Sequence, residues 1–248
     1  MREKDMVHIV VSIAEQTLGL WDDHLCRYDK IYTISTSRNG PGEKKNSYRT
    51  PRGHMTIAEK IGAGQKLGTF FVGRRPVNPD TVVDKSKGIT TRILWLDGAE
   101  PGFNKLGDCD TKERFIYIHG VPIAAPLPRF ISQGCINMTD DDVLDLFDRV
   151  HTGTPVTVYE NKLPSYYVNT KPGNLEEIRN FFPHAPESEW QWMATSTKDQ
   201  SVMGYIAVDD NNIVDMKTTE AHREVTENQM IETIGYYCMA KGYQALSR

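Results

Sequence analysis

The stretch that decides the fold runs from Ile116 to Met138 and reads IYIHGVPIAAPLPRFISQGCINM. It places His119 directly after a short run of strand-forming residues and brings in Cys135 sixteen positions later. A cysteine thiol is mostly protonated at neutral pH, so a nucleophilic cysteine needs a nearby base. His119 is the candidate base, and the carbonyl of Gly120 can fix its tautomer. The stretch therefore predicts a Cys-His pair that attacks a carbonyl carbon.

The residue before the cysteine is Gly134, which permits a tight turn. In such a turn the N–H groups of Gly134 and Cys135 can point at a developing oxyanion, and one donor of this kind lowers a barrier by about 3 kcal/mol. The neighbouring polar residues Ser132, Gln133 and Asn137 are candidates for substrate binding. The alternative interpretation is a small buried cysteine and a hydrogen-bonded histidine without chemistry.

These motifs resemble the YkuD-type L,D-transpeptidase family. The resemblance consists of His-Gly, then Ser-x-Gly-Cys-Ile-Asn-Met, then a polar-capped helix and a Gly-Thr-x-Val-x-Val strand. Upstream, residues 50–53 match the family's Thr-Pro-x-Gly segment, so the similarity covers roughly residues 6 to 160. It implies that Cys135 is the nucleophile, His119 the base and Gly120 the orienting carbonyl. The family motif usually has histidine where this chain has Gln133.

The resemblance implies a mostly β fold and a substrate class, peptidoglycan stem tetrapeptides. The cysteine would attack the bond between diaminopimelate and D-Ala and form a thioester. If water attacks this thioester, the protein is an L,D-carboxypeptidase. If an amine of a second stem attacks it, the protein is a transpeptidase. Residues 90–102, TTRILWLDGAEPG, resemble the murein-recycling branch, and the N-terminus shows no signal-peptide pattern, so a cytoplasmic carboxypeptidase is expected. A transpeptidase and a non-catalytic muropeptide-binding protein stay open as alternatives.

The composition argues against several classes of binding partner. A net charge of -4 argues against a surface for nucleic acid, and no apolar run is long enough to span a membrane. The four cysteines show no Cys-x-x-Cys spacing, and the acidic run 140–142 is typical of a helix N-terminus, so neither a metal nor a cofactor is expected. Arg92 and Arg52 are candidates for binding a substrate carboxylate.

The order of predicted elements indicates two domains. In the catalytic domain, residues 1–162, Thr139 is predicted to cap a helix that buries Val143 and Phe147 and ends before Gly153. The predicted strands of this domain are residues 7–13, 16–21, 31–37, 54–62, 90–96, 115–118 and 155–159.

Residues 163–173 are predicted to form a linker, followed by a small α/β accessory module over residues 174–248. Its predicted elements are helices 174–182 and 224–241 and strands 203–208 and 213–216. This order faintly resembles the acetyl-CoA-binding half of the GNAT acyltransferases. The glycine-rich pyrophosphate loop expected near residues 222–228 has no glycine, which favours a degenerate accessory or homodimerisation module over an active acyltransferase.

Overall fold

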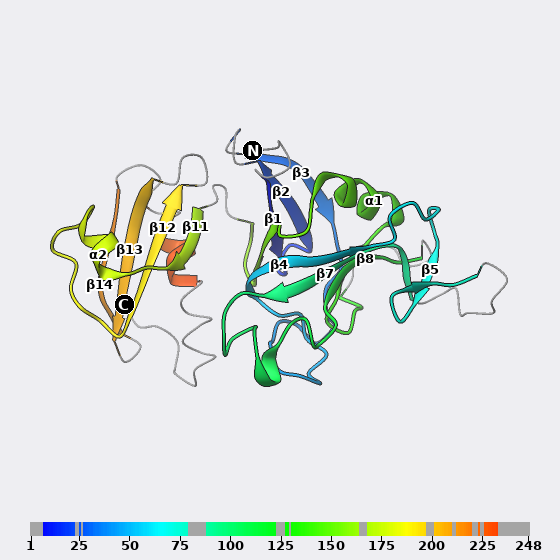
Figure 1. Ribbon diagram of the computed structural model, residues 1–248, viewed down its shortest axis with the longest axis horizontal. Helices are drawn as coiled ribbons and strands as arrows, with labels where there is room; N and C mark the ends of the chain where they lie inside the picture. Colours follow the sequence, from blue (N-terminus) through cyan, green and yellow to red (C-terminus); the bar gives the residue numbers. More distant parts are fainter. Residues whose placement is uncertain are drawn as a thin grey trace. The chain divides into compact units, whose positions relative to one another are not determined.

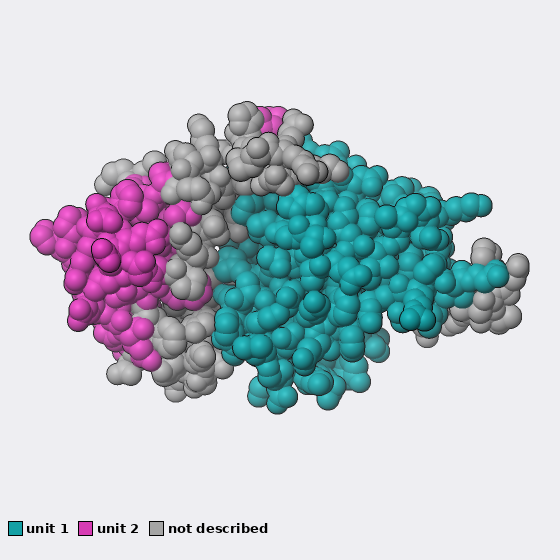
Figure 2. Space-filling view, viewed as in Figure 1, with its two compact units in different colours: residues 1–21, 28–163 teal, residues 22–27, 164–248 magenta. Residues whose placement is uncertain are grey.

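The structure is a computed structural model of the 248-residue chain. It describes residues 7–22, 25, 27–78, 88–122, 127–128, 130–163, 168–196, 201–209, 212–219, 223 and 226–232. The chain divides into two compact units, residues 1–21 with 28–163 and residues 22–27 with 164–248 (Figure 2). Separate clusters of buried apolar side chains occupy the two units, so each is described by itself.

In the described part of the first unit, one mixed sheet of ten strands forms the framework (Figure 1). The strands are β1 (Val7–Ser12), β2 (Thr17–Asp22), β3 (Arg27–Thr33), β4 (Gly53–Ile61), β5 (Phe70–Val72), β6 (Arg75–Pro76), β7 (Ile89–Gly98), β8 (Tyr117–Gly120), β9 (Ile136–Met138) and β10 (Pro155–Tyr159). The main path is β3-β2-β1-β10-β4-β7-β5-β6, while β8 pairs with both β7 and β9. Among the described strands, β1 pairs with β10 and β8 pairs with β9 in parallel.

The strand β1 explains why a continuous apolar run opens the sequence. Its residues Ile9, Val10 and Val11 are all fully buried, so both faces of the strand are covered. A strand buried on both faces loses the alternation of apolar and polar residues.

The ten-stranded sheet confirms the mostly β architecture that was predicted for this unit.

Helix α1 (Asp140–Arg149) packs against β7 and β8. The Oγ1 atom of Thr139 accepts a hydrogen bond from the Asp142 N–H at 3.2 Å, which satisfies one of the free donors of the first turn. Val143 and Phe147 are buried in the sheet-helix layer. The capped helix predicted from the sequence is confirmed.

Most predicted strands of the first unit are confirmed, with three corrections. The predicted strand 31–37 lies too late, because β3 ends at Thr33 and residues 35 and 37 form only isolated bridges. The predicted strand 115–118 is displaced to β8, because Phe115 has a φ of 58°, which is outside the strand region. Strands β5, β6 and β9 were not predicted, since two or three residues are too few to show a pattern.

In the second unit the described residues form an antiparallel sheet in the order β11-β12-β13-β14. Its elements are β11 (Val168–Pro172), α2 (Leu175–Arg179), β12 (Trp190–Ser196), β13 (Val202–Asp209) and β14 (Asn212–Thr218), followed by helical residues 226–232. Strands β13 and β14 confirm the predictions for 203–208 and 213–216. Strand β11 lies within the predicted linker and β12 was not predicted, so both are corrections. The predicted helix 174–182 is shorter, and most of the predicted helix 224–241 lies outside the described residues.

Both faces of this second sheet are covered. Trp192, Ile206 and Met230 belong to one buried cluster, and Met193 and Tyr205 belong to another. Neighbouring residues along a strand point to opposite faces, which places the two clusters on opposite sides of the sheet. Among the helices of the described ranges, none combines the length and the apolar character that a membrane crossing requires.

Candidate active site

Two parallel strands position the candidate pair. In the register of β8 and β9, Ile118 lies opposite Ile136 and His119 lies opposite Asn137. Both isoleucines are fully buried, so the two strands are anchored in the core. Cys135 immediately precedes β9, at the point where the chain enters the sheet. Residues eighteen positions apart in the sequence are thus brought side by side.

The imidazole of His119 is held in one orientation. Its Nδ1 atom lies 2.8 Å from the carbonyl oxygen of Gly120, so Nδ1–H donates and Nε2 is left as the basic atom. The Gly120 carbonyl was expected to fix the tautomer of His119, and that role requires this contact. Burial lowers the pKa of His119 to about 4, although the Gly120 carbonyl opposes that shift. The ring is therefore neutral at pH 7 and able to accept a proton.

A buried carboxylate packs behind this turn. A Cβ on Gly120 would lie 2.6 Å from Oδ1 of Asp140 and 2.7 Å from the Thr90 carbonyl, so only glycine fits. The same Oδ1 accepts hydrogen bonds of 2.6 Å from the hydroxyl groups of Thr90 and Thr91. Asp140 thus closes the space behind His119, at the N-terminus of helix α1.

The Cys135 thiol lies against the backbone that precedes β8. Its Sγ donates to the carbonyl oxygen of Phe115 at 3.5 Å. Burial raises the pKa of the thiol to about 11, while a hydrogen bond from the Tyr117 backbone and the positive charge of Arg114 act in the opposite direction. With both pKa values shifted away from 7, the resting pair is a thiol and a neutral imidazole. A nucleophilic attack by this sulfur would therefore require its proton to move to a base such as His119 during the step.

The turn before the cysteine requires glycine. Gly134 has a φ of 121°, and a Cβ there would lie 3.0 Å from Ile116 Cδ1 and 3.1 Å from the Arg49 carbonyl oxygen. Its N–H donates to Ser132 Oγ at 3.1 Å, and that hydroxyl donates to the Cys135 carbonyl at 2.6 Å.

These bonds bear on two expectations. The Gly134 N–H is engaged with Ser132, which leaves the Cys135 N–H as the candidate oxyanion donor. The hydroxyl of Ser132 braces the turn, and Ser132 also lines the cavity that Cys135 faces, so its part in substrate binding stays a prediction.

The Thr-Pro-x-Gly segment is tied to the same turn. The hydroxyl of Thr50 donates to the Gly134 carbonyl at 3.0 Å and accepts from the Ser37 N–H at 3.0 Å. Both bonds are buried. The two motifs are far apart in the sequence, but they form one hydrogen-bonded unit.

His119 and Cys135 line the same cavity, which has a volume of about 580 Å³. Gln133 and Asn137, both expected to bind substrate, also line it. The Oδ1 atom of Asn137 is buried and has no hydrogen-bond partner among the described residues, so it can accept from a substrate N–H. Arg38 adds a positive charge to the lining.

The two other arginines proposed from the sequence lie elsewhere. The guanidinium of Arg92 donates to the backbone carbonyls of Gln65 and Thr91, which accounts for its burial. Arg52 forms ion pairs with Glu43 at 2.8 Å and Glu160 at 2.7 Å. Neither arginine is among the described residues that line the cavity of Cys135, so their part in binding a substrate carboxylate stays a prediction.

Arg38 and Arg114 were not singled out by sequence reasoning. Arg114 donates to the carbonyls of Gly42 and Arg49, which places its charge near the thiol. The only sequence signal was their position beside motif segments. Arg38 begins a basic loop, residues 38–49, that leads to the Thr-Pro-x-Gly segment, and Arg114 precedes the strand of His119. Among the described residues, no group of three or more His, Cys, Asp or Glu side chains is arranged to hold a metal ion.

A β-sheet that presents a thiol and a buried imidazole to one cavity is the arrangement expected of a cysteine peptidase or acyltransferase. A model of the YkuD family, the L,D-transpeptidase catalytic domain, matches residues 6–158. This match covers more than half of the chain, and the chain therefore belongs to the YkuD family.

Individual relatives are distant. The chain is 23% identical over 154 residues to YqjB of Bacillus subtilis (strain 168), assigned by its name to the L,D-transpeptidases, which covers 62% of this chain and 72% of that protein. The solved structure of the helical cell shape determining protein Pgp2 from Campylobacter jejuni matches with a TM-score of 0.42 and 17% identity, over 64% of this chain and 49% of that one.

L,D-transpeptidase 3 from Mycobacterium tuberculosis, in complex with a faropenem-derived adduct, matches with a TM-score of 0.38 and 21% identity, over 62% and 60% of the two chains. The chain thus spans about half to three fifths of these solved structures. These matches leave roughly the last third of the chain, including the second sheet, outside the shared region.

Proposed function

We propose that this protein is a cysteine-dependent L,D-carboxypeptidase that releases D-Ala from peptidoglycan stem tetrapeptides. The observation that carries the proposal is the pair of Cys135 and His119 on one cavity, with Nε2 of the imidazole left free by the Gly120 carbonyl. Membership of the YkuD family supports the substrate class.

In the first step, Cys135 Sγ attacks the carbonyl carbon between diaminopimelate and D-Ala while Nε2 of His119 accepts the thiol proton. The Cys135 N–H stabilises the oxyanion. The carbon-nitrogen bond then breaks, and His119 gives the proton to the departing amine of D-Ala. Water next attacks the thioester, and His119 transfers the water's proton to the leaving sulfur. The products are a tripeptide and D-Ala, and the enzyme is regenerated.

Polar groups on the cavity suit the ends of this substrate. Arg38 supplies a positive charge for the terminal carboxylate of D-Ala, and the free Oδ1 of Asn137 suits a backbone N–H of the stem. Residues 90–102 support water as the second nucleophile through their resemblance to the murein-recycling branch. We propose the second unit, which lies outside the family match, as an accessory module.

Transpeptidation is the second candidate, because an amine can replace water in the last step. Mass spectrometry of murein tetrapeptide incubated with the protein, with and without an amine acceptor, tests both. Tripeptide and free D-Ala without an acceptor support the carboxypeptidase, whereas products formed only with the amine support the transpeptidase.

The Cys135→Ala variant must abolish every product. Cys109→Ala is the matched control, because Cys109 is also a free thiol but donates to Lys105 and Leu106 carbonyls away from the cavity. An unchanged tetrapeptide under all conditions would overturn both proposals and favour a non-catalytic muropeptide-binding protein.

A further inference from the structure

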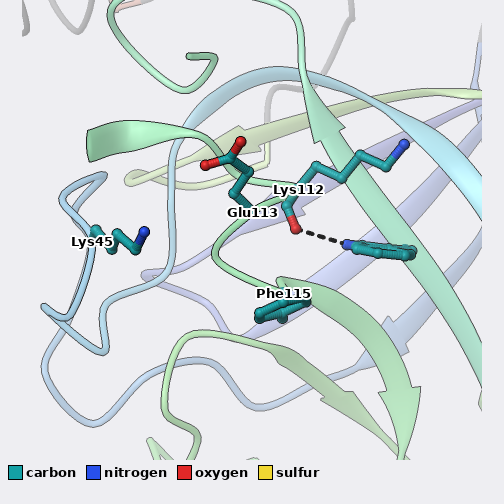
Figure 3. A pocket seen from close by; sticks show the side chains of 5 residues that line it. Lys45, Lys112, Glu113 and Phe115 are labelled. Atoms are coloured by element: carbon teal, nitrogen blue, oxygen red, sulfur yellow. Dashed lines mark hydrogen bonds between the residues drawn. The ribbon is translucent and has the colours of Figure 1, made fainter. Parts of the chain in front are cut away.

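A second cavity, of about 480 Å³, lies beside the candidate active site and has no part in the chemistry above. It is lined by Lys45, Trp95, Lys112, Glu113 and Phe115. In Figure 3, Lys45 comes from a different segment from Lys112, Glu113 and Phe115. The cavity thus joins the basic loop 38–49 to the segment that precedes β8.

Phe115 connects this cavity to the nucleophile. Its ring lines the cavity, and the residue is 52% exposed. Its carbonyl oxygen accepts from Cys135 Sγ at 3.5 Å. The residue also has a φ of 58°, a conformation that costs free energy for any residue with a side chain and that recurs at functional sites.

The aromatic wall of the cavity is rigid. The rings of Trp95 and Phe115 are 6.0 Å apart at an angle of 31°. The guanidinium of Arg74, which does not line the cavity, lies 4.4 Å from the Trp95 ring centroid and 5.3 Å from that of Phe115. Arg74 also donates to the Tyr117 hydroxyl at 3.1 Å, and the Trp95 indole N–H donates to the Lys112 carbonyl at 3.1 Å. A wall ordered before binding loses little entropy when a ligand stacks on it.

The surface of the cavity is mostly apolar, which favours a ligand with an apolar face, and charged groups of the lining residues accompany it. Two ammonium groups, of Lys45 and Lys112, are accompanied by the carboxylate of Glu113. A ligand with several carboxylates would meet the like charge of Glu113. A pyranose ring fits better, since it presents an apolar C–H face to an aromatic ring and hydroxyl and amide groups at its edge to mixed donors and acceptors.

We propose that this cavity binds an N-acetylhexosamine of the peptidoglycan glycan strand, stacked on Phe115 with Lys45, Lys112 and Glu113 at its edge. The inference rests on the proposed function, in which the stem peptide occupies the cavity of Cys135. Three stem residues extend roughly 10 Å, and Phe115 contacts the sulfur through its carbonyl oxygen while its side chain lines the second cavity. The protein thereby prefers a stem peptide that still carries its sugar.

Two measurements on the full chain test this inference. In the first, the peptide-free disaccharide N-acetylglucosaminyl-N-acetylmuramic acid is titrated into the protein by calorimetry. We expect saturable binding that weakens at least tenfold in Phe115→Ala and several-fold in Lys45→Ala. Phe181→Ala is the matched control, since that ring is 57% exposed in the second unit and should leave binding unchanged.

In the second, kcat/KM for D-Ala release is compared between disaccharide tetrapeptide and free tetrapeptide. The ratio should exceed tenfold in the native protein and fall toward one in Phe115→Ala, mainly through KM. Should Phe115→Ala fail to fold, the exposed Lys45→Ala variant carries the same comparison. Absence of disaccharide binding, or a ratio unaltered by both substitutions, overturns the sugar site. Loss of D-Ala release from every substrate refutes the proposed function instead, while the titration still decides the sugar site.

Discussion

Replacing Thr50 by valine should loosen the nucleophile turn without changing the volume of the side chain. The hydroxyl makes two buried bonds of 3.0 Å, to the Gly134 carbonyl and from the Ser37 N–H. Valine removes both, and each unpaired buried group costs about 1–3 kcal/mol. We therefore expect the first unit to lose about 2–6 kcal/mol of its free energy of unfolding.

For a domain of this size such a loss lowers the melting temperature by roughly 5–15 °C. Circular dichroism during heating measures it. The rate of D-Ala release should also fall at least tenfold in kcat, because Gly134 precedes Cys135 and its peptide group loses the tether that orients the turn. Thr50→Ser is the control, since serine keeps the hydroxyl and should retain most of the stability and activity. Equal melting temperatures and equal kcat values for Thr50→Val and Thr50→Ser would refute this account of the motif.

Three further predictions concern the protonation or the charge of individual side chains. Because the pKa of His119 is lowered to about 4 and that of Cys135 raised to about 11, kcat/KM should be level from pH 6 to 9 and fall only as pH drops toward 4; an acid limb centred near 6.5 would contradict this. Burial raises the pKa of Glu100 to about 8, so the folded state keeps a proton that the unfolded chain loses, and stability declines as pH rises from about 4.5 through 8. Glu100→Gln should remove this decline, and a melting-temperature profile unchanged by the substitution would exclude it. Arg38→Gln should raise KM for tetrapeptide several-fold with little change in kcat, as initial rates at varied substrate would show, whereas an unchanged KM would remove Arg38 from the site.

Local patterns account for what could be predicted. Apolar runs and alternation indicated most strands of the first unit, because burial on one or both faces leaves a periodic trace along the chain. The Thr139 cap was visible for the same reason, since a helix start needs an acceptor for its free N–H groups within a few residues. Strands β5, β6, β9, β11 and β12 were missed, because their stability comes from partner strands that no short window of sequence contains.

The candidate site also divides into residues that could be proposed from the sequence and residues that could not. His119, Cys135 and the Gly120 carbonyl could be proposed from residue types, because a thiol nucleophile needs a base and a base needs an orienting acceptor. Which arginine faces the cavity could not be proposed, since Arg38, Arg52 and Arg92 are chemically alike in the sequence. Only the packing of loop 38–49 against the strands decided it.

The sequence by itself determined the chemistry that this protein can carry and the order of its main elements, because both depend on residue type and local spacing. Tertiary structure decided which groups are free to act. It engaged the Gly134 N–H with Ser132, buried the guanidinium of Arg92, and brought Thr50 to the nucleophile turn. Hydrogen-bond partners and burial are set by segments distant in the chain, so they appear only when those segments are folded together.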